Sequence, residues 1–319
     1  MKTQKRVNLK RIRTIPIASR QSKVLPAQFG SSFDPAKDSF RGFVRSLPNI
    51  LVAQDLRTLV ADIIGSRKGH KPVIWMMGAH VIKVGLAPVV IDMIDRGMIT
   101  HVAMNSAASI HDVETAMWGK TSEDVAANLL DGTFGMARET GEFINTTLTR
   151  AYRKKLSEIG YGEALGSRLL KEHPPGIGFS VLAACIRRQI PVTVHAAIGT
   201  DITHQQPSMD GAATGELSMR DFRSLAQSCR GLVGGGVVLN VGSAVILPEV
   251  FLKALTVARN LGSEARGFTT AVFDMFTHYR PTMNVKLRPT QDGGKGFFFI
   301  GHHEIMVPLL AAMILSELE

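Results

Sequence analysis

Residues 231–240 read GLVGGGVVLN, a stretch with four glycines, several apolar residues and no charge. The apolar residues predict a buried strand, and the glycines predict a turn inside or just after it. The spacing G-x-x-G-G-G does not match the G-x-G-x-x-G pattern of dinucleotide-binding turns. The stretch alone therefore leaves two interpretations open, contact with a phosphate group or close approach of two backbone segments.

On either side of this stretch, strand-like and helix-like segments alternate along the chain. The predicted strands cover 71–80, 99–109, 190–201, 232–240 and 268–274, and VKLRP (285–289) and KGFFFIGHH (295–303) predict two more around a TQDGG turn. Helical spacing marks 84–97, 111–120, 139–160, 181–189, 219–230, 247–262 and 304–319. This alternation predicts an α/β fold, a Rossmann-like parallel sheet with helices on both faces. We expect one such domain over 41–319, after a basic extension over 1–40.

Composition narrows the class of protein. Of the 319 residues 45% are hydrophobic and 20% charged, which is typical of a globular protein. Cys185 and Cys229 lack the spacing of metal ligands, so we expect buried, reduced thiols. The basic start is not followed by an apolar core with a cleavage site, and there is no apolar run of about 20 residues. We therefore expect a cytoplasmic protein without a membrane partner.

The positive charge is concentrated at the start of the chain. The net charge is +10, and residues 1–24 contain eight Lys and Arg and no acid. This segment lacks interleaved aromatic residues, and the rest of the chain shows no basic stripe. We interpret it as an arm that packs on a neighbouring subunit and predict no nucleic-acid partner.

Ligands of open α/β sheets bind beyond the carboxyl ends of the strands. The predicted ends carry Gly78–His80, Asn105–His111, His195–His204, Gly234–Asn240, Phe273–His278 and Gly301–His303. The strand-end histidines singled out are His111, His195, His204, His302 and His303. If they converge, they could form an acid–base set or a metal site. The sequence has no HxH or HExxH spacing, so no residue is predicted as a metal ligand.

Five collinear stretches resemble the deoxyhypusine synthase family. They are GAHVIKVGL (78–86), MITHVAMNSAASIHDVE (98–114), IPVTVHAAIGTD (190–201), LVGGGVVLN (232–240) and IGHHEIMVPLLAA (300–312). The resemblance runs from about Pro72 to the C-terminus. It implies a deoxyhypusine synthase-like fold, a homotetramer, NAD as cofactor and transfer of the aminobutyl group of a polyamine through a lysine.

The matched positions supply the candidate site residues. For cofactor binding the resemblance implies Gly78, His80, Asn105, Ser106, Ala107, Asp201, Gly234, Gly235, Gly236, Asp274 and His302. For catalysis it implies Lys286, His111, Asp112 and His204. The family's acidic pair corresponds to His111 and Asp112, and two further family aspartates fall near His204 and on His302. The lysine context corresponds to Lys286, once three-residue gaps are allowed.

Three functions follow from these matches and departures. The first is an NAD-binding protein of this fold whose chemistry differs from aminobutyl transfer. The second is a polyamine transferase of the homospermidine synthase type. The third is a histidine-rich metal-dependent enzyme or a non-catalytic binding protein on the same fold.

Overall fold

The computed structural model describes residues 6–154 and 158–318. The chain divides into two compact units, one ending at Gln54 and one starting at Asp55. The first unit holds three short 3-10 turns, helix α1 (Phe40–Ser46) and the first residues of α2 (Leu51–Lys68). Apolar side chains of its first part are exposed, among them Val7, Leu9 and Ile12.

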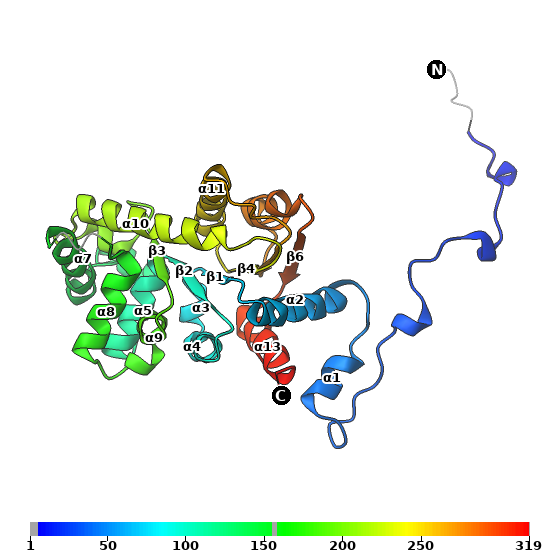
Figure 1. The fold of residues 1–319 in the computed structure, drawn as a ribbon, viewed down its shortest axis with the longest axis horizontal. Coiled ribbons are helices and arrows are strands. Elements are labelled where there is room, and N and C mark those ends of the chain that lie inside the picture. Colours follow the sequence, from blue (N-terminus) through cyan, green and yellow to red (C-terminus); the bar gives the residue numbers. More distant parts are fainter. Residues whose placement is uncertain (1–5, 155–157, 319) are drawn as a thin grey trace. The chain divides into compact units, whose positions relative to one another are not determined.

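The second unit is built on one six-stranded parallel sheet, which confirms the predicted fold class (Figure 1). Its strands lie in the order β3-β2-β1-β4-β5-β6. They are β1 (Val73–Met77), β2 (His101–Asn105), β3 (Val192–His195), β4 (Val237–Val241), β5 (Thr269–Asp274) and β6 (Lys295–Ile300). Because the strand order reverses between β1 and β4, a crevice is expected at the carboxyl ends of these two strands.

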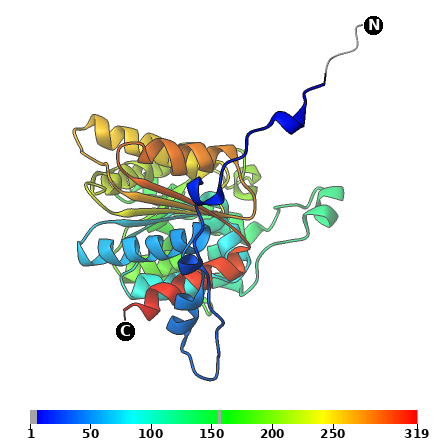
Figure 2. The same cartoon turned by 90° about the vertical axis from the view of Figure 1, so that its right-hand side faces the viewer.

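Helices cover both faces of the sheet, so its central strands are buried on both sides (Figure 2). All five residues of β1 and all five of β4 are buried, which is why β1 is entirely apolar and β4 is apolar except for Asn240. The longer helices are α4 (Ala87–Asp95), α5 (Ser106–Trp118), α7 (Arg138–Arg153), α8 (Tyr161–Glu172), α10 (Gly211–Arg230), α11 (Ile246–Asn260) and α13 (His303–Ser316). The shorter ones are α3 (His80–Lys83), α6 (Val125–Leu130), α9 (Val181–Arg187) and α12 (Tyr279–Pro281). None of the helices within the described ranges has the length and apolar character needed to cross a bilayer.

Helix α5 begins earlier than the sequence predicted. The small polar residues after β2 were expected to form a loop, but they form the first turn of the helix. Asn105 caps this turn, since its Oδ1 accepts a hydrogen bond from the N–H of Ala108 at 3.0 Å. His111 is therefore in the middle of a helix and not in a loop.

The prediction of a strand over 285–289 is wrong. This segment belongs to a π-helical turn, Thr282–Leu287, and the 3-10 turn that follows it. The place beside β5 is taken by β6, which runs parallel to it. A hairpin of two strands around TQDGG would have to be antiparallel, so only its second half can join this sheet.

The glycines of GLVGGGVVLN precede their strand, which corrects the predicted turn at its end. The φ angles of Gly234, Gly235 and Gly236 are +59°, +151° and +94°. Three successive residues with positive φ cannot form a strand, so β4 starts only at Val237. The three glycines therefore lie at the amino edge of the sheet.

Both cysteines are buried and unpaired, as predicted. Burial raises the pKa of the Cys229 thiol to about 12, so this group stays protonated.

A buried polar chain runs between α10 and strands β2 and β3. His101 Nδ1 lies 2.7 Å from Ser228 Oγ, and its Nε2 lies 3.0 Å from Thr193 Oγ1. The same hydroxyl is 3.0 Å from His195 Nε2. Desolvation, together with His195 in the case of His101, lowers the pKa of each histidine to about 3, so both rings are neutral.

We expect these two histidines to weaken the fold at acid pH. Because the folded pKa lies below the ordinary value of 6.5, the unfolded chain takes up protons first as the pH falls. Above pH 6.5 the two neutral rings make their full contribution to the free energy of unfolding. Between pH 6.5 and about 3 the free energy of unfolding falls by about 1.4 kcal/mol per pH unit for each ring. Denaturant unfolding at pH 7.5 and at pH 4.5 measures the free energy of unfolding of the wild type and of His101→Gln. Between these two pH values this free energy should fall by about 2.7 kcal/mol less in the variant than in the wild type. Equal losses in both proteins would contradict the assignment.

Candidate active site

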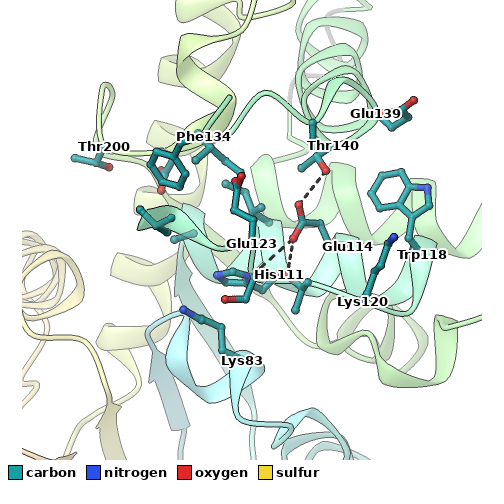
Figure 3. A pocket seen from close by; sticks show the side chains of 18 residues that line it. Lys83, His111, Glu114, Trp118, Lys120, Glu123, Phe134, Glu139, Thr140 and Thr200 are labelled. Atoms are coloured by element: carbon teal, nitrogen blue, oxygen red, sulfur yellow. Dashed lines mark hydrogen bonds and ion pairs between the residues drawn. The ribbon is translucent and has the colours of Figure 1, made fainter. Parts of the chain in front are cut away.

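A cavity of about 790 Å³ lies at the carboxyl edge of the sheet, beside β2 and β3 (Figure 3). We call it the carboxyl-edge cavity. Its walls come from α3, α5, the chain from Trp118 to Thr140, and the loop after β3. The lining residues that bear on its chemistry are Lys83, His111, Glu114, Lys120, Thr121, Glu123, Glu139, Thr140 and Asp201.

His111 belongs to a hydrogen-bonded chain that determines its tautomer. Thr121 Oγ1 donates its single proton to Glu114 Oε2 at 2.5 Å, because a carboxylate only accepts. The same hydroxyl lies 2.6 Å from His111 Nδ1, so Nδ1 must carry a proton and donate it. Nε2 of His111 is then the unprotonated nitrogen. Glu114 is held in turn by Thr140, whose hydroxyl donates to Oε1 at 2.9 Å.

The surroundings keep His111 neutral. Desolvation and the nearby Lys83 ammonium group lower the pKa of His111 to about 4. The Glu114 carboxylate, 3.9 Å from Nδ1, does not offset these two effects. At neutral pH the ring is therefore a hydrogen-bond acceptor or base through Nε2.

Carboxylates exceed ammonium groups in this cavity. Four carboxylates line it, together with two lysines, and the neutral His111 adds no charge. The carboxylates are Glu114, Glu123, Glu139 and Asp201. An excess of negative charge in a partly enclosed space favours a cationic ligand.

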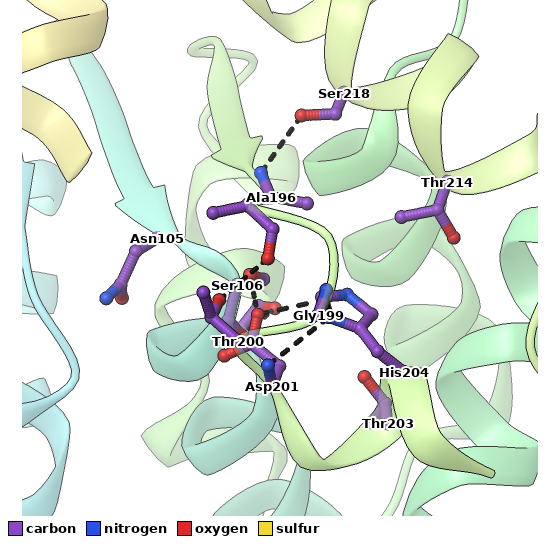
Figure 4. A network of polar contacts seen from close by, with 12 residues as sticks. Asn105, Ser106, Ala196, Gly199, Thr200, Asp201, Thr203, His204, Thr214 and Ser218 are labelled. Carbon is purple, nitrogen blue, oxygen red and sulfur yellow. Dashed lines mark hydrogen bonds and ion pairs between the residues drawn. The ribbon is translucent and has the colours of Figure 1, made fainter. Parts of the chain in front are cut away.

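The loop after β3 supplies Asp201 and is held by His204 (Figure 4). Nδ1 of His204 accepts hydrogen bonds from the N–H groups of Gly199 and Asp201, at 3.1 and 3.2 Å. The Asp201 carboxylate accepts a hydrogen bond from Ser106 Oγ at the start of α5. His204 is buried within this loop and is not among the residues that line the cavity, so its catalytic role stays a prediction. It positions the loop that carries Asp201.

A second group of polar residues lies at the crevice between β1 and β4. The N–H of Gly78 donates to Val241 O at 2.9 Å, and Gly242 has a φ of +66°. The ring of His303 packs on Gly242, since a methyl group there would lie 2.4 Å from Nε2. Asn240 Oδ1 and His303 Nδ1 are buried without a hydrogen-bond partner among the described residues. Such groups are costly unless another molecule satisfies them.

Asp112, predicted as catalytic, is not among the residues that line the cavity. Its side chain is fully buried, and it accepts hydrogen bonds from Ser180 Oγ at 2.6 Å and from the N–H of Val181 at 2.7 Å. Burial raises its pKa to about 6, although these bonds favour the charged form. Asp112 therefore stabilises the start of α9 and does not face the cavity.

Two other predicted site residues lie far along the sheet from the cavity. Lys286 is in the π-helical turn, where its backbone oxygen lies against Gly296 near the start of β6. This is the amino edge of the sheet, away from the cavity, and the catalytic role of Lys286 stays a prediction. His302 is exposed at the carboxyl end of β6, the strand farthest from β2 and β3.

The other residues predicted to bind the cofactor are divided between the two edges of the sheet. Gly78, His80, Asn105, Ser106, Ala107 and Asp274 all lie at or just after the carboxyl ends of β1, β2 and β5. Gly234, Gly235 and Gly236 lie at the opposite edge and cannot contribute to a site at the carboxyl ends.

The predicted histidines do not converge. His111 lines the cavity, His195 is buried under α10, and His204 and His302 lie on separate loops. Within the described ranges no cluster of three or more His, Cys, Asp or Glu could hold a metal ion.

Sequence reasoning predicted only His111 and Asp201 among the polar cavity residues and missed, among others, Lys83, Glu114 and Thr121. Glu114 had a usable signal, because it follows His111 by three positions and such residues share a helix face. Lys83 and Thr121 had none, because only the packing of α3 and of the chain after α5 brings them to His111.

No protein-family model matches the chain, and no curated protein does either. Solved structures match it in fold. AgrE in its complex with ornithine and NAD⁺ has a TM-score of 0.54 at 13% identity, over 86% of this chain and 35% of AgrE. The chain thus corresponds to about a third of that protein.

Two shorter proteins also match. A protein assigned as a deoxyhypusine synthase from Entamoeba histolytica has a TM-score of 0.52 at 11% identity, over 90% of this chain and 96% of that one. A conserved protein of the LOR/SDH type from Methanococcus maripaludis has a TM-score of 0.51 at 14% identity, over 83% and 70%. At these identities the comparisons establish the fold.

Proposed function

We propose that this protein uses NAD to oxidise a small amine held in the carboxyl-edge cavity. The observation that carries the proposal is the neutral His111, held in one tautomer by Thr121 and Glu114 beside an excess of carboxylates. Two neighbours in fold support it. The AgrE complex contains NAD⁺ and the amine ornithine, and the resemblance to deoxyhypusine synthases implies NAD and a polyamine.

A dinucleotide would bind at the carboxyl ends of β1 and β4, where open α/β sheets hold such ligands. Gly78 leaves no side chain between the two strand ends, and Asn240 and His303 each offer a buried, unpartnered polar atom. Gly78, His80, Ser243, Asp274 and His303 would hold the cofactor, which when bound supplies a hydride acceptor.

In the cavity, the chain's own residues bind the amine and move its proton. Carboxylates such as Glu114 and Asp201 hold the ammonium group of the substrate. Nε2 of His111 removes one proton from it, which frees the nitrogen lone pair. The adjacent carbon then releases a hydride, and the substrate leaves as an imine that has lost one proton and one hydride.

A second candidate is transfer of the oxidised group to another amine, as the resemblance implies. Lys83 favours it, because this lysine lines the cavity and could carry the group as an imine, whereas Lys286 lies at the amino edge of the sheet. The homotetramer and the cytoplasmic location implied by the sequence stay predictions.

Binding of NAD is tested by thermal unfolding. At 100 times its dissociation constant, NAD should stabilise the fold by about 2.7 kcal/mol, which raises the melting temperature by about 5 °C. Nicotinamide mononucleotide serves as the comparison and should raise it less. An unchanged melting temperature at millimolar NAD would rule out the cofactor.

The same protein is then incubated with NAD and spermidine, putrescine or ornithine, and NADH is followed. Mass spectrometry of the products separates the two candidates, because oxidation gives an aldehyde or cyclic imine and transfer gives a longer amine. NAD binding without NADH from any of these amines would contradict amine oxidation.

A further inference from the structure

A second hollow of about 830 Å³ lies at the opposite, amino edge of the sheet. We call it the amino-edge hollow. It is bounded by the end of α2, the loop into β1, the loop between α4 and β2, and the end of α10. The polar side chains that line it include those of Arg67, Lys68, His70, Lys71, Thr100 and Ser228.

The charge of this hollow is of one sign. Arg67, Lys68 and Lys71 bring three permanent positive charges, and His70 lies between them in the chain. No carboxylate occurs among the described residues that line the hollow. Basic residues in the last turn of α2 complement the helix dipole, but Lys71 lies beyond the helix end and outside that effect.

The glycine stretch borders this hollow and explains how Lys71 is held. Gly231 lines the hollow, and Lys71 Nζ donates to Val233 O at 2.8 Å. A methyl group at Gly235 would lie 3.6 Å from Lys71 Cγ. The side chain is therefore fixed along the glycine turn, so less conformational entropy is lost when its ammonium group meets an anion.

We propose that the amino-edge hollow binds a small phosphate-bearing molecule. Cations gathered in a concave site without acids repel one another, and a polyphosphate dianion removes this repulsion and accepts hydrogen bonds from all of them. The volume is that of a small-molecule site. A nucleic-acid surface would need a basic stripe over a wider area than this hollow.

The site is separate from the proposed catalytic one, because the two lie at opposite edges of the sheet. Calorimetric titration of the full chain with pyrophosphate tests it. The double variant Arg67→Gln/Lys68→Gln should bind about tenfold more weakly or worse, since each charged hydrogen bond contributes at least that factor. Both side chains are exposed, so the variant should keep the melting temperature of the wild type.

The control removes the same charge elsewhere on the surface. Arg153→Gln/Lys171→Gln changes two exposed residues outside the hollow and should bind pyrophosphate as the wild type does. No heat with wild type, or equal weakening by both double variants, would overturn the proposal. Binding of a DNA duplex without binding of pyrophosphate would replace it by a nucleic-acid surface. NAD should raise the melting temperature of the wild type and of Arg67→Gln/Lys68→Gln equally. A failure of the pyrophosphate experiment is therefore distinguishable from a failure of the proposed function.

Discussion

Replacement of His111 by asparagine is expected to lower the rate of NADH formation from the amine substrate by about 10²- to 10⁴-fold. Asparagine can still donate a hydrogen bond to Thr121, so the chain to Glu114 is kept while the basic Nε2 is lost. The loss should fall mainly on kcat, because the carboxylates that bind the ammonium group are unchanged.

The pH profile gives a second readout of the same residue. Since the pKa of His111 is about 4, the wild-type rate should rise with pH through that value and level off above it. Lys83→Met removes one of the two causes of the lowered pKa, so the rise should move to higher pH. NMR titration of the His111 ring measures this shift independently of activity.

His173→Asn is the matched control for His111→Asn. His173 ends α8 with a φ of +49°, a conformation that asparagine tolerates well, and it lies outside the cavity. The His173→Asn protein should form NADH at the same rate as the wild type. A His111→Asn protein that keeps a third or more of the wild-type rate would refute the role of Nε2.

Replacement of Gly78 by alanine is expected to destabilise the fold by about 4 kcal/mol or more. The added methyl group would lie 2.1 Å from the carbonyl oxygen of Gly242 and 2.9 Å from its carbon. These are backbone atoms of the next strand, so the ends of β1 and β4 would have to separate. Chemical denaturation of the purified protein, or its loss from the soluble fraction, measures the effect.

Gly215→Ala in α10 is the control for Gly78→Ala. Nothing lies within 4 Å of the position its methyl group would take, and the residue is in a helix interior. This change should be neutral or stabilise by up to about 1 kcal/mol. If Gly78→Ala were as stable as Gly215→Ala, the close approach of the two strand ends would be wrong.

Local sequence patterns were sufficient to predict those elements whose structure depends on their own residues. The buried strands at 73–77 and 237–241 are apolar, except for Asn240, because helices cover both faces of the sheet, and that pattern is visible in the chain. The glycine stretch was harder, because glycine permits a turn at either end of a strand. Positive φ angles at Gly234–Gly236 place the turn before β4, and the sequence does not encode that choice locally.

The site depended more on packing than on motifs. Aligned motifs identified Asp112 and Lys286, which have the right residue types but lie elsewhere in the fold. His111, predicted as catalytic, lines the cavity, but its tautomer depends on Thr121, ten positions later in an irregular segment. No periodicity or spacing rule connects these two positions.

The sequence by itself determined the alternation of strands and helices, the parallel sheet and the concentration of polar residues at the carboxyl ends. These features can be predicted because hydrophobic periodicity, and glycine or proline at the ends of elements, depend on only a few neighbouring residues. Only the tertiary structure decided which polar residues meet. The cavity joins Lys83, Glu114 and Asp201 from three separate connections of the sheet, and their distances depend on how helices pack over it. The same packing places the glycines of GLVGGGVVLN at the amino edge of the sheet, beside the basic hollow.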